Sequence, residues 1–326
     1  MKHISVLVPR GAASVSCIEG SFKLFSTVND FLAGQGKQPL FNVQMVGLSK
    51  EAQTYDSVFK VIPDLTIEER FKTDLIIIPA VNGEWDKVIE LNKDFFPWIS
   101  KQHSQGAEVA SLCVGAFLLA STGLLNGKKC ATHWIAQNDF RKMFPEVNLV
   151  SEKIITDEQG VYSSGGASSF YNLLLYIIEK YTDREMAVLF SKYFEIEIDR
   201  YNQSAFIMFT GQRHHQDESV KKAQEFIENN FQDKTTIDQL ADMLALGRRS
   251  LERRFKKATN NTVVEYIQRV KIEAAKKSFE TSRKNINEVM YDVGYSDTKA
   301  FRTTFKKITG LSPVEYRNKY NKEAAA

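Results

Sequence analysis

The last third of the chain contains a duplicated segment, and this duplication constrains the fold more than any other feature of the sequence. Residues 255–266 read FKKATNNTVVEY and residues 305–316 read FKKITGLSPVEY, so seven of twelve positions are identical at an offset of 50. Self-similarity at a fixed spacing indicates a repeated supersecondary unit. Two copies are too few for a solenoid, and the sequence therefore predicts a pair of similar motifs.

Each copy is predicted to be a short helix, a tight turn and a second helix. Leu251 and Phe255 form an i, i+4 apolar pair in the second helix of the first copy, and Phe301 and Phe305 repeat it in the second copy. Gly294 allows the tight turn of the second copy, because glycine adopts conformations that other residues avoid. This turn is one residue longer than that of the first copy. The first helices have apolar faces at helical spacing, formed by Ile237, Leu240, Ala241 and Leu244 and by Ile286, Val289, Met290 and Val293.

This pattern is typical of a helix-turn-helix, whose second helix enters the major groove of DNA. Ser296 or Asp297 is expected to cap that helix in the second copy. A helix over Val263–Phe279 is expected to join the copies. The residues expected to contact DNA are Arg248, Arg249, Ser250, Arg253 and Lys257 in the first copy and Ser296, Asp297, Thr298, Lys299, Arg302 and Lys306 in the second. Arg254 and Lys256 are also counted among the outward cations of the first copy.

The distribution of charge agrees with a nucleic-acid partner at this end. Residues 217–326 hold 22 Lys and Arg against 16 Asp and Glu, whereas residues 1–216 hold 21 against 24. A basic segment beside a mildly acidic body is typical of a DNA-binding module, because cations neutralise phosphates. A solvated helical surface would give a similar excess, so the charge supports the motif and does not replace it.

The run GYSDTKAFRTTFKKITGLSPVEYR, Gly294–Arg317, closely resembles the signature of the AraC family of bacterial transcription regulators. The resemblance extends from Ser219 to about Tyr320. It implies a double-stranded DNA operator and RNA polymerase as partners. The first copy departs from the family pattern at Gly247, Asn260 and Val263, which leaves its base contacts less defined.

The first two-thirds of the chain alternates strand and helix patterns, which predicts an open, mostly parallel α/β sheet of flavodoxin-like type with helices on both faces. Strands are expected at Ile4–Pro9, Phe41–Leu48, Thr73–Ala80, Glu108–Leu112, Leu149–Ile155 and Gly160–Ser164, the last two as a hairpin. Helices are expected at Ile18–Leu32, with Phe22, Phe25 and Val28 on one side, and at Asp86–His103. A Gly-rich turn over SSGGASS opens a further apolar helix.

Ligands of such sheets bind at the carboxyl ends of the strands, where Cys113 and Gly83 fall. The segment ASLCVGAFLLASTGLLNGKKCATHW, Ala110–Trp134, resembles the ThiJ/PfpI superfamily, with Cys113 at the elbow and His133 twenty residues on. Joined to the AraC-type end, the chain resembles the GlxA-type regulators, including the linker Arg200–Phe206. The expected effector pocket comprises Cys17, Gly83, Cys113, Val114, His133, Trp134 and Gly165.

Catalysis by Cys113 would require a thiolate, a base and donors for an oxyanion. His133 is the candidate base, and the N–H groups of Val114 and Gly115 are candidate donors. Superfamily enzymes carry an acid in the first loop, where this chain has Cys17. Three interpretations stay open: a packed elbow residue, a ligand-contacting or redox-responsive thiol, and the nucleophile of a hydrolase, amidase or glyoxalase-like enzyme. We favour a regulator that is not an enzyme.

The expected organisation is an effector-binding and dimerisation domain over 1–198, a linker over 199–217, a DNA-binding domain over 218–320 and a tail over 321–326. Three cysteines without metal-ligand spacing indicate a reducing cytoplasm, and the resemblance to the AraC family implies a bacterial one. Neither a cofactor nor a metal is expected. No apolar run is long enough for a membrane span, and the first strand is too short for a signal peptide. The partners expected besides DNA and RNA polymerase are a small-molecule effector and a second copy of the chain.

Overall fold

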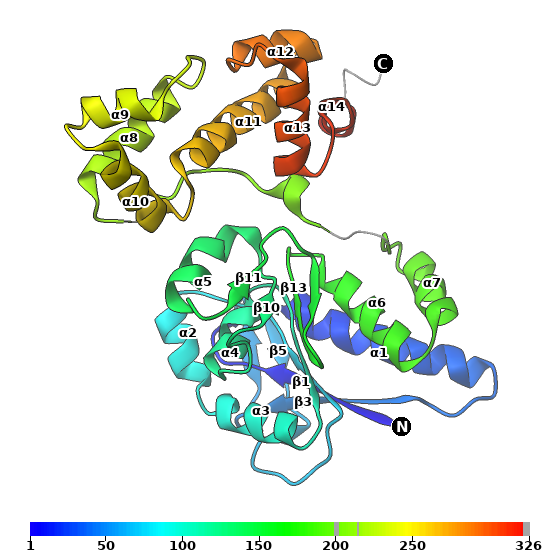
Figure 1. The fold of residues 1–326 in the computed structure, drawn as a ribbon. Helices are drawn as coiled ribbons and strands as arrows, with labels where there is room; N and C mark the ends of the chain where they lie inside the picture. Colours follow the sequence, from blue (N-terminus) through cyan, green and yellow to red (C-terminus); the bar gives the residue numbers. More distant parts are fainter. Residues whose placement is uncertain (199–201, 214, 322–326) are drawn as a thin grey trace. The chain divides into compact units, whose positions relative to one another are not determined.

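The computed structural model describes residues 1–198, 202–213 and 215–321, and it divides the chain into two compact units, Met1–Gln203 and Ser204–Ala326 (Figure 1). Part of the expected linker, residues 199–201 and 214, and all but the first residue of the expected tail lie outside the described residues. Within the described part, no helix combines the length and apolarity needed to cross a membrane.

The first unit is built on a seven-stranded sheet in the order β12-β13-β9-β7-β1-β3-β6. Its strands are β1 (Lys2–Val8), β3 (Phe41–Gly47), β6 (Leu65–Thr66), β7 (Leu75–Ile78), β9 (Glu108–Ser111), β12 (Ile155–Asp157) and β13 (Val161–Ser164). All neighbours are parallel except β12 and β13, which form an antiparallel hairpin. A hairpin was expected here, but its first strand covers Ile155–Asp157 and not the expected Leu149–Ile155, since residues 150–154 lie outside β12. Short two-stranded pairs lie outside this sheet: β2 (Ala12–Ala13) with β8 (Val81–Asn82), β4 (Gln53–Tyr55) with β5 (Phe59–Val61), and β10 (Lys129–Cys130) with β11 (Asn148–Leu149). The predicted mostly parallel α/β sheet is confirmed.

Helices cover both faces of this sheet (Figure 1). One face packs against α1 (Val15–Gly34) and α6 (Phe170–Tyr181), with α7 (Arg184–Tyr193) against α6. The other carries α2 (Trp85–Asn92), α3 (Phe95–Ser104) and α4 (Ala116–Ser121), and α5 (Gln137–Met143) follows them along the chain. The buried core comprises residues from every strand of the central parallel set, including the fully buried run over β7.

Two details of the predicted helices were wrong. The single helix expected over Asp86–His103 is two helices, α2 and α3, because Pro97 lacks an N–H and so belongs to the first turn of a new helix. Phe22 does not join the buried side of α1: it is 44% exposed, whereas Phe25 and Val28 are fully buried.

The second unit is entirely helical within the described residues. Its helices are η3 (Ser204–Phe206), α8 (Glu218–Asn229), α9 (Ile237–Met243), α10 (Arg248–Thr259), α11 (Val263–Thr281), α12 (Ile286–Asp292), α13 (Thr298–Thr309) and α14 (Pro313–Tyr320). Helices α9 and α10 form one helix-turn-helix, α12 and α13 form the other, and α11 connects them (Figure 1). Both predicted motifs and the connecting helix are confirmed.

Each helix-turn-helix has its own hydrophobic core. Leu251 and Phe255 lie in the first core, and Phe301 and Phe305 in the second, so the i, i+4 pairs point inward as the spacing predicts. Helix α11 contributes Tyr266 and other residues of its first half to one core, and residues of its second half to the other. The duplication therefore produces two small cores that share one helix.

The turns of the two copies have matching backbones. Ala245 and Gly294 end the first helices in the left-handed region, with φ of +51° and +73°. The N–H groups of Leu246 and Tyr295 each donate to a carbonyl oxygen five residues earlier, at 2.9 and 3.0 Å. The second copy then has one more residue, Ser296, before its second helix, which is the insertion that the sequence comparison indicated.

Candidate functional site

The second helix of each copy presents cations along one exposed stripe. Arg249, Arg253 and Lys257 follow helical spacing on α10, and all three are exposed. On α13 a similar stripe consists of Lys299, Arg302 and Lys306, also exposed, although only Lys299 occupies a position that matches the first copy. Within the described residues, none of these six side chains forms a salt bridge. Their charges are therefore available to an anionic partner.

Two other arginines on α10 have partners within the chain. Arg254 donates two hydrogen bonds to the carboxylate of Asp217, at 2.8 and 2.6 Å, and this contact lowers the pKa of Asp217. Asp217 is also the N-cap of α8. Arg254 is therefore a packing residue and not one of the outward cations that the sequence indicated. Arg248 lies 3.1 Å from Asp238, so its guanidinium is partly neutralised.

The two stripes begin differently. Asp297 caps α13 by accepting hydrogen bonds from the N–H groups of Lys299 and Ala300, at 2.8 and 3.4 Å. Of the two expected caps, Asp297 is thus the one used, and Ser296 is exposed. Gly247 at the start of α10 makes no side-chain cap, so the first N–H groups of that helix have no such acceptor. Ser250 is half-buried on α10, and Thr298 is exposed at the first position of α13.

In the first unit, the chain makes a strained turn directly after β9. Cys113 has φ of +54°, a left-handed conformation that is unfavourable for a residue with a Cβ. Its N–H donates to Ser164 Oγ at 3.1 Å, and its carbonyl accepts from Thr132 Oγ1 at the same distance. The turn also requires Gly115, because a Cβ there would lie 2.6 Å from the carbonyl oxygen of Ile78. The elbow expected from the sequence is present.

The thiol at this elbow is protonated at neutral pH. Burial and, to a smaller extent, the neighbouring Cys17 raise the pKa of Cys113 to about 12, although the N–H of Val114 opposes the shift. Cys17 is itself buried and its pKa is raised for the same reason, burial. Both are free thiols. A nucleophilic cysteine needs a cation, a helix N-terminus or a base that stabilises the thiolate, and the net effect of these surroundings is the opposite.

Two of the other predicted catalytic groups make hydrogen bonds within the chain. Nδ1 of His133 accepts the N–H of Ile135 at 3.1 Å, and partial burial lowers the pKa of the imidazole. The N–H of Gly115 donates to the carbonyl of Leu112 at 2.8 Å, so it is not free to hold an oxyanion, contrary to expectation. The elbow thus combines the strained turn expected of a nucleophile with a thiol whose pKa is raised.

The other residues predicted for the effector pocket come from several segments of the chain and differ in burial. Strand β8, which precedes Gly83, packs against the elbow turn, and Gly83 has φ of +136°. Val114 is buried beside Cys113. Trp134 is half-buried, with its ring 5.6 Å from that of His133. Gly165 lies against the amide of a residue that the sequence did not single out, Gln203, which a Cβ at Gly165 would approach to 2.2 Å.

Sequence reasoning missed three polar side chains at this site. Gln203 and Ser164 are buried and bonded to the backbone around the elbow, and Ser169 is buried at the start of α6. The sequence offered two signals for these residues. A Ser-Ser pair ends a buried strand, and Gln203 lies in the segment that resembles the GlxA-type regulators. Neither the Ser-Ser pair nor Gln203 stands in a sequence pattern that would distinguish a buried polar side chain from an exposed one.

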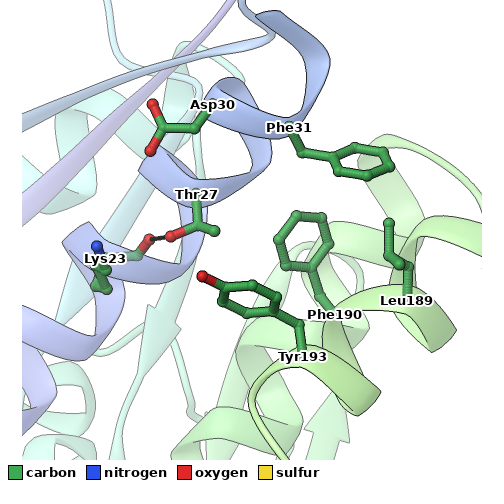
Figure 2. A pocket seen from close by; sticks show the side chains of 7 residues that line it. All are labelled: Lys23, Thr27, Asp30, Phe31, Leu189, Phe190 and Tyr193. Carbon is green, nitrogen blue, oxygen red and sulfur yellow. Dashed lines mark hydrogen bonds between the residues drawn. The ribbon is translucent and has the colours of Figure 1, made fainter. Parts of the chain in front are cut away.

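A separate cavity of about 260 Å³ lies between α1 and α7 (Figure 2). It is lined by Lys23, Thr27, Asp30, Phe31, Leu189, Phe190 and Tyr193. None of the predicted effector-pocket residues is among them. Among the described residues no group of His, Cys, Asp and Glu side chains has the geometry of a metal site.

Comparison with known proteins finds a match to one family model in each unit. A model described as a helix-turn-helix domain matches residues 240–319, and a model of the DJ-1/PfpI family matches residues 26–180. The HTH-type transcriptional regulator GbdR of Pseudomonas aeruginosa is 24% identical over 261 residues, 79% of this chain and 70% of that protein. The regulator ArgR of the same organism is 27% identical over 65% of each chain, so the match spans slightly less than two-thirds of ArgR.

A solved structure has a similar fold over part of this chain. An AraC family transcriptional regulator from Pseudomonas putida superposes with a TM-score of 0.51 at 13% identity, over 60% of this chain and all of that one. At this identity the likeness shows the fold alone.

Proposed function

We propose a division of labour for this chain, which is a DNA-binding transcription regulator of the AraC family with a DJ-1/PfpI domain ahead of its helix-turn-helix domain. In this proposal α10 and α13 read a double-stranded operator, and the elbow of the first unit binds a small-molecule effector without catalysis. We keep the expected boundaries: 1–198 for sensing and pairing, 199–217 as linker and 218–320 for DNA.

The exposed cation stripes on α10 and α13 carry the DNA assignment. Arg249 and Arg302, near the starts of their helices, are proposed to hydrogen-bond base edges, because arginine matches the two acceptors of guanine. Arg253, Lys257 and Lys306 are proposed to contact phosphates, which fixes the register of each helix and makes affinity depend on salt. The remaining expected contacts, Arg248, Ser250, Ser296, Asp297, Thr298 and Lys299, are proposed as secondary.

A binding experiment tests this assignment. A duplex selected from a random library with the full chain would be titrated by fluorescence anisotropy at several salt concentrations. Replacing Arg253 and Lys257 by Ala is expected to reduce the slope of log affinity against log salt by about 2, one per lost phosphate contact. Lys277→Ala, on the exposed side of α11, is the matched control and should leave the slope unchanged. An unchanged slope in the double variant would contradict the placement of the stripes.

We propose that the first unit is a sensor and not an enzyme. The elbow thiol has its pKa raised to about 12, so very little thiolate exists at neutral pH to attack a substrate. Turnover of model amides and α-oxoaldehydes should be absent from the wild type and unchanged by Cys113→Ala. Cys113-dependent turnover would restore the hydrolase or glyoxalase-like interpretation. Loss of peroxide-sensitive DNA binding in Cys113→Ser would instead favour a redox sensor.

The sensing role is tested by coupling two measurements on the full chain. A thermal-shift screen finds compounds that stabilise the protein, since a ligand of the folded state raises its melting temperature by mass action. The same compounds are then added to the DNA titration. A regulator that senses through the first unit changes its DNA affinity with at least one of them, because an effector must bind one state of the chain more tightly than another.

We propose that two copies pair through α1 and α7, around the cavity of Figure 2. Phe31 and Tyr193 are exposed there, and Lys23 and Asp30 lie seven residues apart on the same exposed stripe of α1. In a two-fold antiparallel contact of α1 with its copy, each Lys23 faces the Asp30 of the other chain, which is the self-complementarity an isologous interface requires.

Charge reversal tests this interface. Lys23→Asp or Asp30→Lys alone places like charges across the two-fold axis and is expected to weaken the dimer, whereas the double variant restores opposite charges. Light scattering after size exclusion reports the outcome. Two single variants that dimerise as the wild type does would contradict this surface. The proposal further places the chain in the bacterial cytoplasm, with RNA polymerase as its downstream partner.

A further inference from the structure

Gln203, the last residue of the first unit, is held in place by its side-chain nitrogen. Nε2 lies 2.9 Å from the carbonyl oxygens of Thr132 and Ser151 and 3.2 Å from that of Lys153. The backbone N–H of Gln203 donates to Glu152 at 2.8 Å. Because three carbonyl oxygens surround one end of the amide, that end must be the nitrogen, and Oε1 must be the other.

The oxygen at the other end has no hydrogen-bond partner among the described residues. Oε1 of Gln203 is buried without a hydrogen bond from any described residue, and so is Oγ of Ser169. Ser169 is at the N-cap position of α6, yet its hydroxyl does not cap the helix. A Cβ at Gly166 would lie 2.6 Å from Ser169 Oγ and 3.7 Å from Gln203 Oε1, so the two orphan atoms flank the same turn. Buried polar atoms without partners are uncommon and unfavourable, which points to a missing donor.

This pair of atoms adjoins the elbow. The carbonyl of Thr132 accepts from Gln203 Nε2, while its hydroxyl donates to the carbonyl of Cys113. On the other side, Ser164 accepts the N–H of Cys113 and is followed directly by the turn at Gly165. One chain of hydrogen bonds, through Thr132, and one stretch of backbone, from Ser164 to Ser169, therefore connect the orphan atoms to the turn at which we place the effector.

We propose that Ser169 and Gln203 form a polar sub-site that accepts an N–H donor of the effector, a protonated amine or an amide. Oε1 of Gln203 can only accept, so the group that binds it must donate. A cationic N–H donor makes the stronger bond, because hydrogen bonds with one ionised partner are shorter and stronger than neutral ones. Quaternary ammonium ions and simple carboxylates have no such donor. The sub-site rests on the proposed function, in that the elbow is taken as the sensing site.

The position of Gln203 gives the sub-site a regulatory consequence. The next residue, Ser204, begins the second unit, and from there the linker is bound to α11. Lys276 donates to the carbonyl of Ile207 at 2.6 Å, and the N–H of Phe209 donates to Glu273 at 3.1 Å. Anything that shifts Gln203 on ligand binding therefore acts a few residues from the helix that joins the two DNA-reading motifs.

The first test needs no ligand. In the ligand-free full chain, Ser169→Ala removes a buried hydroxyl that has no partner, so the melting temperature is expected to stay the same or to rise by about 1–4 °C. Ser168→Ala, at the exposed neighbouring serine, is the matched control and should have no effect. A drop of several degrees in Ser169→Ala alone would show that the hydroxyl makes a structural bond, and would overturn the sub-site.

The second test uses matched probes. Common L-amino acids, primary alkylamines and primary amides carry N–H donors, whereas tetramethylammonium and acetate do not. At least one donor-bearing probe is expected to raise the melting temperature of the wild type, and Ser169→Ala is expected to weaken that probe about tenfold. Ser168→Ala should bind it as the wild type does. A response to donor-free probes alone, no response to any probe, or equal binding by Ser169→Ala would each overturn the proposal.

DNA titrations separate this proposal from the proposed function. A probe that changes the DNA affinity of the wild type and of Ser169→Ala equally would leave the regulator intact and refute the sub-site. A probe that binds the wild type tenfold more tightly than Ser169→Ala, yet never alters DNA affinity, would support the sub-site and refute sensing. A crystal structure of the chain saturated with the probe should place a donor nitrogen within hydrogen-bond distance of Gln203 Oε1, and a water alone at that position would count against it.

Discussion

The two helix-turn-helix copies have the same backbone plan and different side-chain support. The residue in the left-handed turn is Ala245 in one and Gly294 in the other. The second helix begins without a side-chain cap at Gly247 in the first copy and is capped by Asp297 in the second. At matching positions of those helices, Arg254 reaches out to α8, whereas Thr304 interacts with Tyr295 inside its own copy.

The shared features are those on which the backbone depends. Thr259 and Thr309 both donate to the carbonyl four residues earlier, at 2.8 and 2.9 Å, and each precedes a left-handed residue that ends the helix. The buried pairs of Leu or Phe with Phe are also retained. After duplication, the positions that set the path of the chain stayed alike, while caps and surface charges diverged. Each difference predicts an unequal response of the two copies to a matched substitution.

The largest inequality is expected at the turn. Gly294→Ala would put a Cβ 2.0 Å from the carbonyl oxygen of Gln232 and 2.5 Å from Nζ of Lys271, in addition to the left-handed strain. Backbone movement is then unavoidable, and a loss of about 2–5 kcal/mol in the free energy of unfolding is expected. Urea denaturation followed by circular dichroism measures it.

The matched change in the first copy should act in the opposite direction. Ala245→Gly relieves the left-handed strain of Ala245 but adds backbone freedom to the unfolded chain, so a net gain of up to about 1 kcal/mol is expected. If Ala245→Gly destabilised the chain as much as Gly294→Ala does, the turns would not be equivalent.

A smaller inequality is expected in DNA affinity. Arg249→Ala and Arg302→Ala are each expected to weaken binding to the selected operator by about 1–3 kcal/mol, because each side chain is proposed to read a base. The loss of affinity caused by Arg249→Ala should depend more strongly on salt concentration than that caused by Arg302→Ala. The reason is that Arg249 lies on the more basic of the two helices. Fluorescence anisotropy at two salt concentrations tests both. Unchanged affinity in both variants would mean that these helices are not the readers.

A smaller difference, in stability, is expected between substitutions at the N-caps of α10 and α13. Asp297→Ala removes an N-cap with two hydrogen bonds and is expected to cost about 0.5–2 kcal/mol of stability. Gly247→Ser adds a cap to the first copy and should gain only a few tenths of a kcal/mol, because glycine is itself a tolerated N-cap. Denaturation curves of the two variants decide this. Equal effects of opposite sign would contradict the unequal capping.

The smallest effect is expected at the ion pair that only the first copy has. Asp217→Asn keeps the N-cap of α8 and removes the charge opposite Arg254. The pKa of Asp217 is lowered in the folded chain, so its contribution is present above about pH 4 and is lost as pH falls through the folded value. The variant should therefore be slightly less stable at neutral pH, and its stability should fall less on acidification. Parallel pH curves for variant and wild type would contradict a charge effect.

How far the sequence predicts this molecule depends on the range of the interactions. Helices, strands and both motifs were predictable because apolar spacing and turn residues are local, and Phe301 and Phe305 lie where the spacing places them. The insertion at Ser296 was also visible, since it shifts the register between two copies of one pattern.

The properties of the candidate sites depend on residues far apart in the chain. Arg254 was misassigned because its partner Asp217 is 37 residues away. The raised pKa of Cys113 arises from burial and from Cys17, which no spacing connects to it. Gln203 was missed because the sequence does not show whether a glutamine in a linker is buried or exposed. The sequence thus predicted where the elbow lies, and only the packing around it determines its chemistry.

The separate cores along α11 have a consequence for how the protein searches DNA. Each motif is stabilised by its own cluster of side chains. In the proposed complex with DNA, one motif would therefore be able to leave its groove while the packing of the other stays intact. A chain with two such contacts can move between neighbouring sites while remaining attached through one of them. The duplication would then determine both the residence time on DNA and the rate of target search, since one motif stays bound while the other binds neighbouring sites in turn.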